Sequence, residues 1–202
     1  MPKDHMEKLY CSKNRLVRYV HTTRLERIIH EISFLRMNSP RILDVGCGEG
    51  HLIKRLALQG YKKVYGIDIA DTALESAMKR CKKAHIINMD AQKIHFPDAL
   101  FDIVICTEVI EHIPNYRQAL NEMKRVLGPR GVLILTFPNE RIWRFCRLLI
   151  GRWPLRVRDH IHSLNPALIS RQLKMKPCSK QGLPLNTPFF LSPCYLMIFQ
   201  KE

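Results

Sequence analysis

One short run of residues constrains this chain more than any other. Residues 42–50 read ILDVGCGEG, an apolar strand that passes through Asp44 and ends in glycines 46, 48 and 50. Glycines at these positions let the backbone turn tightly and approach a ligand closely, because any Cβ would fill that space. The run therefore predicts a strand-turn-helix unit that wraps around a nucleotide-sized ligand.

The spacing argues against a dinucleotide. A dinucleotide turn reads G-x-G-x-x-G, whereas here the third glycine comes one residue early and His51 stands where glycine is needed. A carboxylate at Asp44 would also repel a pyrophosphate, but it would favour a cationic group such as an ammonium or a sulfonium. A ligand without phosphates suits this turn better.

Further apolar runs follow, and each leads into polar residues: Val64–Ile67 before Asp68, Ala84–Met89 before Asp90, and Phe101–Cys106 before Thr107. Asp68 stands close to the roughly 20-residue offset at which a ribose-binding acid follows a glycine turn. It could instead cap the next helix, but Asp71 is better placed for that role. Open α/β sheets bind ligands along the carboxyl edge of their strands, so these polar residues predict a binding edge.

The order of elements predicts an α/β domain with a parallel sheet covered on both faces. Helical patterns cover Thr22–Leu35, His51–Leu58, Thr72–Lys82 and Tyr116–Leu127, and a turn at Leu127–Gly131 precedes a fifth strand, Val132–Phe137. The 202 residues suffice for one such domain. Seven cysteines without a C-x-x-C pair, and no apolar stretch of membrane-spanning length, predict an intracellular, cytoplasmic protein.

Together these runs resemble the class I S-adenosylmethionine-dependent methyltransferases, in particular the ubiquinone and menaquinone biosynthesis group. The resemblance implies a Rossmann-like doubly wound, mostly parallel sheet whose last strand, Cys194–Phe199, is antiparallel. It divides the single domain 1–202 into an N-terminal helical segment (1–39), a core that binds S-adenosylmethionine (40–140), and a substrate lid with the C-terminal strands (141–202). No sixth strand can be placed within Ser163–Pro193.

The resemblance also assigns cofactor-binding positions, with Asp68 on the ribose and Asp90 on the adenine amino group. These positions are Asp44, Gly46, Cys47, Gly48, Gly50, Asp68, Ile69, Asp90, Ala91 and Thr107. Methyl transfer from a sulfonium is an in-line displacement that needs no nucleophile on the enzyme. A hydroxyl acceptor would need a base, and Glu111 and His112 are the candidate catalytic residues. His112 could instead serve only to close its loop.

A metal site is an alternative use of the same residues. Glu108, Glu111 and His112 would share one face if their segment is helical, and His160 could add a further ligand. This pattern is similar to the E-x-x-E-H and distant histidine of small-RNA 2′-O-methyltransferases. Many relatives that carry E-V-x-E-H are not known to use a metal, so we expect none and retain these four residues as candidate ligands only.

The formal net charge of +15 is concentrated towards the C-terminus, where Asp159 is the only acid between Arg141 and Gly182. Three arginines fall on one side of a helical wheel over 141–149 and mostly apolar side chains on the other. Such a helix can lie on an anionic membrane, and one hypothesis is peripheral membrane contact through residues 141–158. It could equally pack against the domain with its basic face in water.

The leading hypothesis is therefore methyl transfer from S-adenosylmethionine to a small-molecule or lipid-like acceptor, through oxygen. One alternative is an enzyme that methylates RNA 2′-hydroxyls, although few aromatic residues in the basic segment could stack on bases. Another is a non-catalytic module that binds S-adenosylmethionine, since a fold does not by itself imply an activity.

Overall fold

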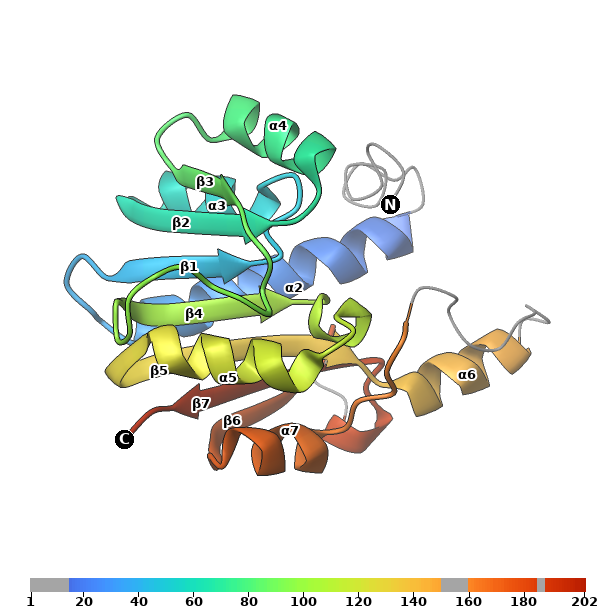
Figure 1. Cartoon of the computed structure of the whole chain (residues 1–202). Helices are drawn as coiled ribbons and strands as arrows, with labels where there is room; N and C mark the ends of the chain where they lie inside the picture. The colour runs from blue at the N-terminus through green and yellow to red at the C-terminus, as the bar shows by residue number, and fades with distance from the viewer. Residues whose placement is uncertain (1–14, 150–159, 185–187) are drawn as a thin grey trace.

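The computed structural model describes residues 15–149, 160–184 and 188–202, which build a seven-stranded sheet with helices on both sides (Figure 1). The strands are β1 (Arg41–Val45), β2 (Lys63–Asp68), β3 (His85–Asn88), β4 (Phe101–Thr107), β5 (Leu127–Pro138), β6 (Pro177–Leu183) and β7 (Cys194–Gln200). The helices are α2 (Arg15–Phe34), α3 (His51–Leu58), α4 (Asp71–Arg80), α5 (Tyr116–Val126), α6 (Glu140–Leu149) and α7 (Pro166–Leu173), with 3-10 turns η1 (Ile110–His112) and η2 (Phe189–Leu191).

The strand order is β3-β2-β1-β4-β5-β7-β6. Pairing is parallel from β3 to β5, whereas β7 runs antiparallel to both β5 and β6. The predicted doubly wound sheet and its antiparallel last strand are thus confirmed. Because β1 pairs with β2 on one side and β4 on the other, the strand order reverses at β1, and ligands bind at such a reversal.

Each face of the sheet buries its own apolar core, as the period of two along a strand requires. Ile42 faces the core formed with α2, α3 and α4, whereas its neighbour Leu43 faces the core formed with α5 and α7. The helix expected at Tyr116–Leu127 is α5, and its apolar side is buried, with Leu120 and Met123 fully enclosed. Helix α2 covers the face of the sheet that Ile42 points to, where its residues Leu25, Ile28 and Ile32 are buried in the core.

No helix connects β3 to β4 across residues 89–100. Instead, the rings of Tyr65, Phe96 and Phe101 pack edge to face, with centroids 5.1–5.9 Å apart. These aromatic contacts pack the connection against the sheet in place of the helix that connects the strands of a regular βαβ unit.

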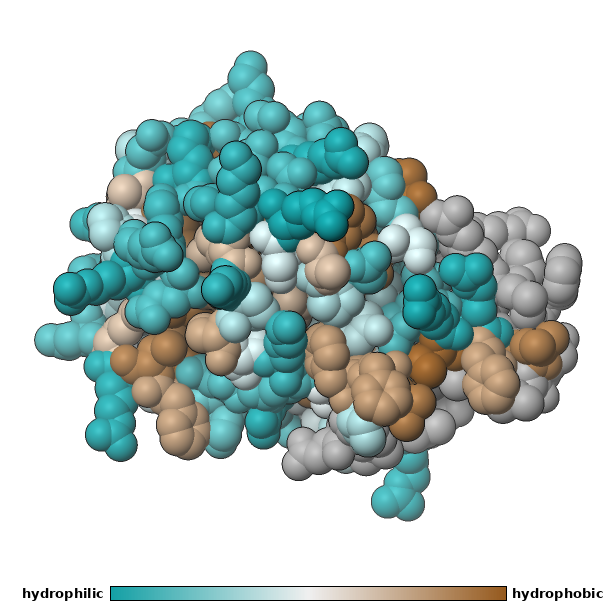
Figure 2. Space-filling model, turned by 90° about the horizontal axis from the view of Figure 1, so that it is seen from below, coloured by the Kyte–Doolittle hydropathy of each residue, from teal (hydrophilic) through white to brown (hydrophobic). Residues whose placement is uncertain are grey.

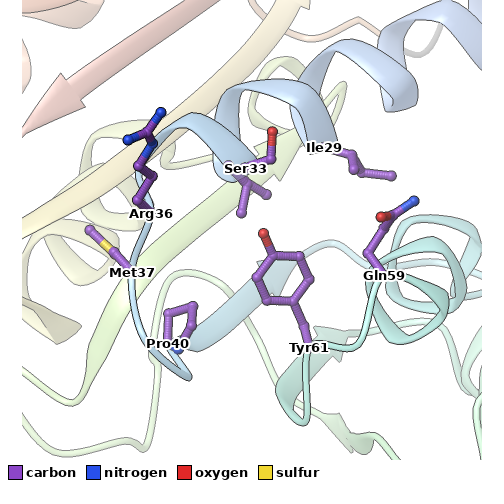
Figure 3. Close-up of a pocket in the computed structure, with 8 residues that line it drawn as sticks. Ile29, Ser33, Arg36, Met37, Pro40, Gln59 and Tyr61 are labelled. Carbon is purple, nitrogen blue, oxygen red and sulfur yellow. The ribbon is translucent and has the colours of Figure 1, made fainter.

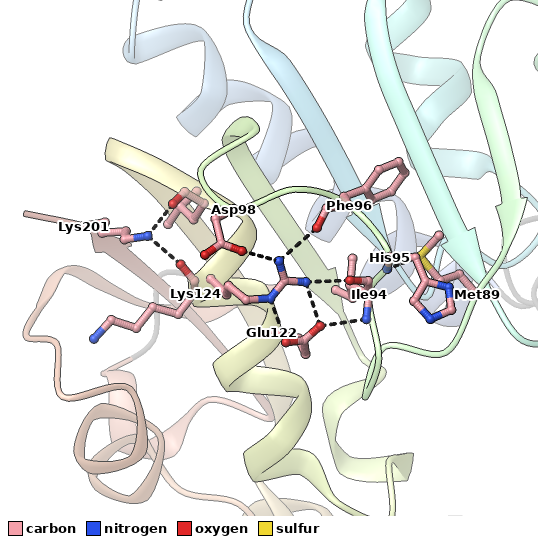
Figure 4. Close-up of polar contacts among 10 residues, drawn as sticks. Met89, Ile94, His95, Phe96, Asp98, Glu122, Lys124 and Lys201 are labelled. Atoms are coloured by element: carbon pink, nitrogen blue, oxygen red, sulfur yellow. Dashed lines mark hydrogen bonds and ion pairs between the residues drawn. The ribbon is translucent and has the colours of Figure 1, made fainter.

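A guanidinium also holds this connection to α5 (Figure 4). Arg125 donates to the carbonyl oxygens of Ile94 (2.5 Å) and Phe96 (2.9 Å) and to the carboxylates of Asp98 and Glu122. Glu122 in turn accepts a hydrogen bond from the Ile94 amide at 2.8 Å. The loop that leaves the carboxyl end of β3 is therefore anchored by charge-assisted bonds.

Some sequence expectations differ from the structure. Strand β5 begins at Leu127 rather than after a turn, because Leu127 already pairs with Phe101 before the register shifts. Asp71 lies in the first turn of α4 and does not cap it. The strand that could not be placed is β6, whose largely polar sequence carries little apolar signal because it forms an edge of the sheet.

A cavity of about 230 Å³ lies between α2 and the turn after α3 (Figure 3). Its lining includes Ser33, Arg36, Pro40, Gln59 and Tyr61. Pro40 precedes β1, so this cavity lies at the amino edge of the sheet, opposite the glycine turn. Within the described ranges, no helix combines the length and apolar character needed to cross a bilayer.

Candidate active site

The glycine turn after β1 has the backbone that its sequence requires. Gly46, Gly48 and Gly50 have φ values of 75°, 51° and 75°, which favour glycine. A Cβ on Gly46 would lie 2.4 Å from a methyl carbon of Val109, so the turn packs directly against the segment after β4. Among the described residues, apart from its chain neighbours, no atom lies within 4 Å of a Cβ added to Gly48. The middle of the turn therefore borders open space that a ligand can occupy.

Asp68, at the end of β2, braces this turn. Its Oδ2 accepts a hydrogen bond from the Gly48 amide at 2.8 Å, and its Oδ1 accepts one from the Ala70 amide at 2.9 Å. Each carboxylate oxygen retains a further lone pair. The residue predicted to bind ribose thus also shapes the glycine turn.

Asp44, on β1 next to the turn, is only 3% exposed. Burial, followed by the nearby charge of Asp68, raises the pKa of Asp44 to about 7. An ionised carboxylate in such surroundings gains strongly from a cationic ligand group. This agrees with the electrostatic argument made for an ammonium or a sulfonium.

The remaining predicted cofactor residues lie along the same carboxyl edge. Cys47 and Ala91 are buried, Ile69 is exposed, and the carboxylate of Asp90 accepts a hydrogen bond from the Gln92 amide at 2.8 Å. The hydroxyl of Thr107 is buried and has no hydrogen-bond partner among the described residues. The structure gathers the predicted positions at one edge, and their individual contacts with a cofactor stay predictions.

The segment after β4 corrects one expectation. Glu108 has a φ of 53° and lies outside the single 3-10 turn η1, so it does not share a helical face with Glu111 and His112. Its carboxylate lies 3.4 Å from Arg24 Nη1 and accepts a hydrogen bond from Cys194 Sγ at 3.1 Å. Arg24 therefore holds Glu108 away from the other candidate ligands.

Glu111, His112 and His160 do come together. One side-chain ligand atom from each lies within 4.8 Å of the others. Glu111 is 1% exposed, and neither carboxylate oxygen has a hydrogen-bond partner within the described ranges, although His112 Nε2 lies 3.8 Å from Oε1. Burial, followed by the charge of Glu108, raises the pKa of Glu111 well above its usual value. A carboxylate in this state is suited to take up a proton or to meet a cation.

His160 has a partner that sequence reasoning missed. Its Nδ1 is hydrogen bonded to Oε1 of Glu140, which is 3% exposed. The rings of His112 and His160 meet edge to face at 5.0 Å. Glu140 follows β5 at the same sheet edge as Asp68 and Asp90, and this position was the available signal. Glu140 was not singled out from the sequence, because the amphipathic helix was expected to begin at Arg141.

The cluster has some, but not all, of what a metal requires. Glu111, His112 and His160 offer three ligands, whereas zinc usually takes four and magnesium six. Glu108, the fourth candidate, is engaged elsewhere. A cation here would have to complete its coordination with water or substrate.

Helix α6 projects from the body and presents apolar side chains to solvent (Figures 1 and 2). Trp143, Phe145 and Leu148 are 39%, 58% and 60% exposed, so the described part of this helix does not pack its apolar side on the domain. Exposed arginines lie beside them, at 141 and 144. Arg147 and the part of 141–158 beyond Leu149 lie outside what can be described.

Further exposed apolar residues border this helix. Asn139, just before α6, donates from its backbone to Pro193 O and from Nδ2 to Phe190 O, which ties α6 to η2. Phe190 and Leu191 on η2 are 69% and 52% exposed. We call Trp143, Phe145, Leu148, Phe190 and Leu191 the apolar rim. Figure 2 shows brown side chains gathered at this end of the molecule.

Comparisons with known proteins agree with this geometry. Residues 43–135 match a family model described as a methyltransferase domain. The chain is 31% identical over 170 residues to the ubiquinone biosynthesis O-methyltransferase of Rickettsia akari, covering 78% of this chain and 67% of that protein. The protein of the same name from Neisseria meningitidis is 27% identical over 140 residues, with 62% of this chain and 59% of the relative covered. The chain thus spans about two thirds or less of these relatives' length.

Solved structures share the fold. A magnesium protoporphyrin IX methyltransferase from Synechocystis superposes with a TM-score of 0.75 at 17% identity, covering 98% of this chain and 94% of that one. A SAM-dependent methyltransferase from Aquifex aeolicus superposes with a TM-score of 0.71 at 17% identity over the full length of both chains. At these identities the likeness establishes the architecture alone.

Proposed function

Because this chain belongs to the class I S-adenosylmethionine-dependent methyltransferase family, we propose that it methylates a hydroxyl oxygen of a small, lipid-like acceptor. The observation that carries the proposal is the buried carboxylate of Glu111, which has no hydrogen-bond partner among the described residues and lies beside two histidines at the same sheet edge as the glycine turn. The name of the relatives, ubiquinone biosynthesis O-methyltransferase, supports oxygen as the acceptor atom.

The cofactor edge fits S-adenosylmethionine, which supplies a methyl group on a sulfonium when bound. Gly48 leaves room for close approach, and Asp44 offers a buried carboxylate to a cationic group. Asp68, at the end of β2, is the proposed ribose ligand, and Asp90, two residues after β3, is the proposed adenine ligand. Each of these residues positions the cofactor or balances its charge, and none forms a covalent bond to it.

The cluster of Glu111, His112 and His160 is the proposed acceptor site, where the methyl acceptor would bind. Within it, Glu111 and His112 are the proposed general bases. The acceptor oxygen forms a bond to the methyl carbon as the carbon–sulfur bond breaks, and the hydroxyl proton passes to a carboxylate oxygen of Glu111 or to the His112 ring. A buried carboxylate with a raised pKa holds that proton well. Exclusion of water and alignment of the two reactants supply most of the remaining acceleration.

This chemistry is tested with a probe acceptor. We expect the protein to convert free catechol and S-adenosylmethionine to a methyl ether and S-adenosylhomocysteine. Glu111→Gln should lower kcat by roughly 100-fold, in the range for loss of a general base, while the affinity for S-adenosylhomocysteine stays within twofold. Unchanged kcat in Glu111→Gln would remove Glu111 from the reaction.

We also propose that the acceptor is reached at a membrane surface through the apolar rim and its flanking arginines. Aromatic and aliphatic side chains beside basic residues suit the boundary between headgroups and acyl chains. Helix α6, which carries three residues of the apolar rim, begins at Glu140, and Glu140 is hydrogen bonded to His160. The rim therefore adjoins the cluster of Glu111, His112 and His160 rather than a remote face. A lipid-like acceptor could then enter from the surface on which the protein lies.

Vesicle flotation tests this part. Wild type should bind vesicles of phosphatidylcholine with phosphatidylglycerol, and the double change Phe145→Ser with Leu148→Ser should abolish most of that binding. The matched control is Phe34→Ser with Leu58→Ser, since these side chains are 66% and 76% exposed on α2 and α3. Equal binding by all three proteins would contradict a role for α6.

The same cluster supports a second candidate, a divalent cation held by Glu111, His112 and His160, which would act as a Lewis acid on the acceptor hydroxyl. Exhaustive dialysis against EDTA distinguishes the metal-dependent mechanism from proton transfer to Glu111 or His112 alone. Activity that survives chelation excludes the cation, whereas activity lost and then restored by one divalent metal establishes it.

A further inference from the structure

We propose that Glu140 is a positioning residue that fixes the orientation and tautomer of His160 and thereby keeps His160 Nε2 available to the acceptor site. This inference rests on the proposed function, because it concerns the acceptor side of the same reaction. It adds a carboxylate that the sequence motifs did not indicate.

The first support is the contact itself. Glu140 Oε1 is hydrogen bonded to His160 Nδ1, with the two side chains 3% and 13% exposed. A carboxylate accepts hydrogen bonds, so Nδ1 carries the proton and the lone pair is left on Nε2. A histidine without such a partner exchanges between two tautomers and can rotate its ring.

Both partners are anchored by separate parts of the backbone. The residue before Glu140, Asn139, donates to Pro193 O (2.8 Å) and Phe190 O (3.1 Å). On the other side, the amides of Ile161 and His162 both donate to Glu111 O, at 3.0 and 3.2 Å. The hydrogen bond therefore joins two fixed segments.

The surroundings explain why the orientation matters. The His160 ring meets His112 edge to face at 5.0 Å, and the buried carboxyl of Glu111 lies against His112. Glu140 contacts His160 directly, and Glu111 and His112 offer ligand atoms within 4.8 Å of one on His160. Two imidazoles this close together can both act on one acceptor hydroxyl when the unprotonated nitrogen of each ring has a fixed position.

The role of Glu140 is the same under either candidate chemistry. A proton acceptor and a metal ligand both use the lone pair of a neutral imidazole nitrogen. In both cases, a carboxylate behind the histidine fixes the ring and raises its basicity. The proposal therefore does not depend on the outcome of the chelation experiment.

The test compares Glu140→Gln, Glu140→Asp and the control Glu75→Gln, an exposed glutamate on α4. An amide can donate to Nδ1 and so favours the wrong tautomer. We expect Glu140→Gln to lower kcat for free catechol by roughly 10- to 100-fold, as for other residues that orient a site histidine. Glu140→Asp should recover part of the loss, Glu75→Gln should match wild type, and S-adenosylhomocysteine affinity should stay within twofold throughout.

A second readout does not depend on catalysis. In ¹⁵N-histidine NMR of the intact protein, the His160 ring, identified by its loss in His160→Gln, should show the Nδ1–H tautomer in wild type and in Glu140→Asp. Glu140→Gln should shift it toward Nε2–H. If wild type gives this signature but does not methylate catechol, the proposed function fails and the positioning role stands. An unchanged tautomer in Glu140→Gln would overturn the inference. So would an unchanged kcat in Glu140→Gln when wild type is active, or a loss of S-adenosylhomocysteine affinity as large as the loss of kcat.

Discussion

Arg24 of α2 and Glu108, the residue that follows β4, form an ion pair with a nitrogen–oxygen distance of 3.4 Å. The arginine side chain is 4% exposed and the glutamate 23%. Glu108 holds a left-handed backbone conformation, and the next residue, Val109, fills the space beside Gly46. The N-terminal helix is thus linked through one ion pair to the turn that borders the cofactor edge.

Arg24→Met should destabilise the protein by about 3 kcal/mol, because it leaves a largely buried carboxylate without its cation. The double variant Arg24→Met with Glu108→Gln should be more stable than the sum of the two single changes predicts. Urea unfolding of the four proteins measures this coupling. Strictly additive effects would show that the pair carries no interaction of its own.

Gly48→Ala should weaken S-adenosylhomocysteine binding by more than about tenfold, or 1.4 kcal/mol, because its Cβ would enter the space reserved for the cofactor. The control is Gly60→Ala. Gly60 has a φ of 89°, and a Cβ there would also meet nothing within 4 Å among the described residues, but it lies just after α3 and away from the glycine turn. Both changes carry a similar backbone penalty. Calorimetry should find wild-type affinity for S-adenosylhomocysteine in Gly60→Ala and weakened affinity in Gly48→Ala. Equal affinity in the two variants would contradict a cofactor site beside Gly48.

Affinity for S-adenosylmethionine should fall as the pH drops below the pKa of Asp44, about 7. The cationic ligand binds the ionised carboxylate, so protonation of Asp44 competes with it, and the loss approaches about tenfold per pH unit. Calorimetric titrations between pH 5.5 and 8.5 measure the slope. Asp44→Asn should bind weakly at every pH, and a slope that persists in this variant would assign the effect to another group.

The ion pair between Glu122 and Arg125 should make part of the free energy of unfolding sensitive to acid. The hydrogen bond from Arg125 lowers the pKa of Glu122 below its ordinary 4.5, so its contribution is complete above pH 4.5 and is lost as the pH falls through the lowered value. Glu122→Gln should cost about 1.5 kcal/mol at pH 7, in the range for hydrogen bonds to charged groups. The cost should shrink at pH 3, and a difference that does not change with pH would contradict this.

The parts of the fold that sequence predicted best are those with a strong local pattern. Strands β1, β2 and β4 are continuous apolar runs because both of their faces are buried, and Leu120 and Met123 lie on the buried stripe of α5. The glycine turn was equally visible because its backbone excludes other residues. The edge strand β6 was not visible in the sequence, since only its last two residues, Gly182 and Leu183, are buried.

The candidate site was predicted less completely because it depends on tertiary contacts. The spacing of Glu108, Glu111 and His112 suggested a shared face, but Arg24, 84 positions earlier in the chain than Glu108, pairs with Glu108 and withdraws it. The partnership of Glu140 with His160 joins residues on either side of an undescribed segment. Neither contact has a periodic signal along the sequence.

The most direct test of the central claim follows the methyl group itself. Purified protein would be incubated with methyl-labelled S-adenosylmethionine and an extract of the source cells, and label would be counted in lipid, nucleic-acid, protein and small-molecule fractions, with Asp68→Ala as the control. We predict label above the control in the lipid fraction. Label confined to nucleic acid or protein, or no label in any fraction despite measured cofactor binding, would contradict the account.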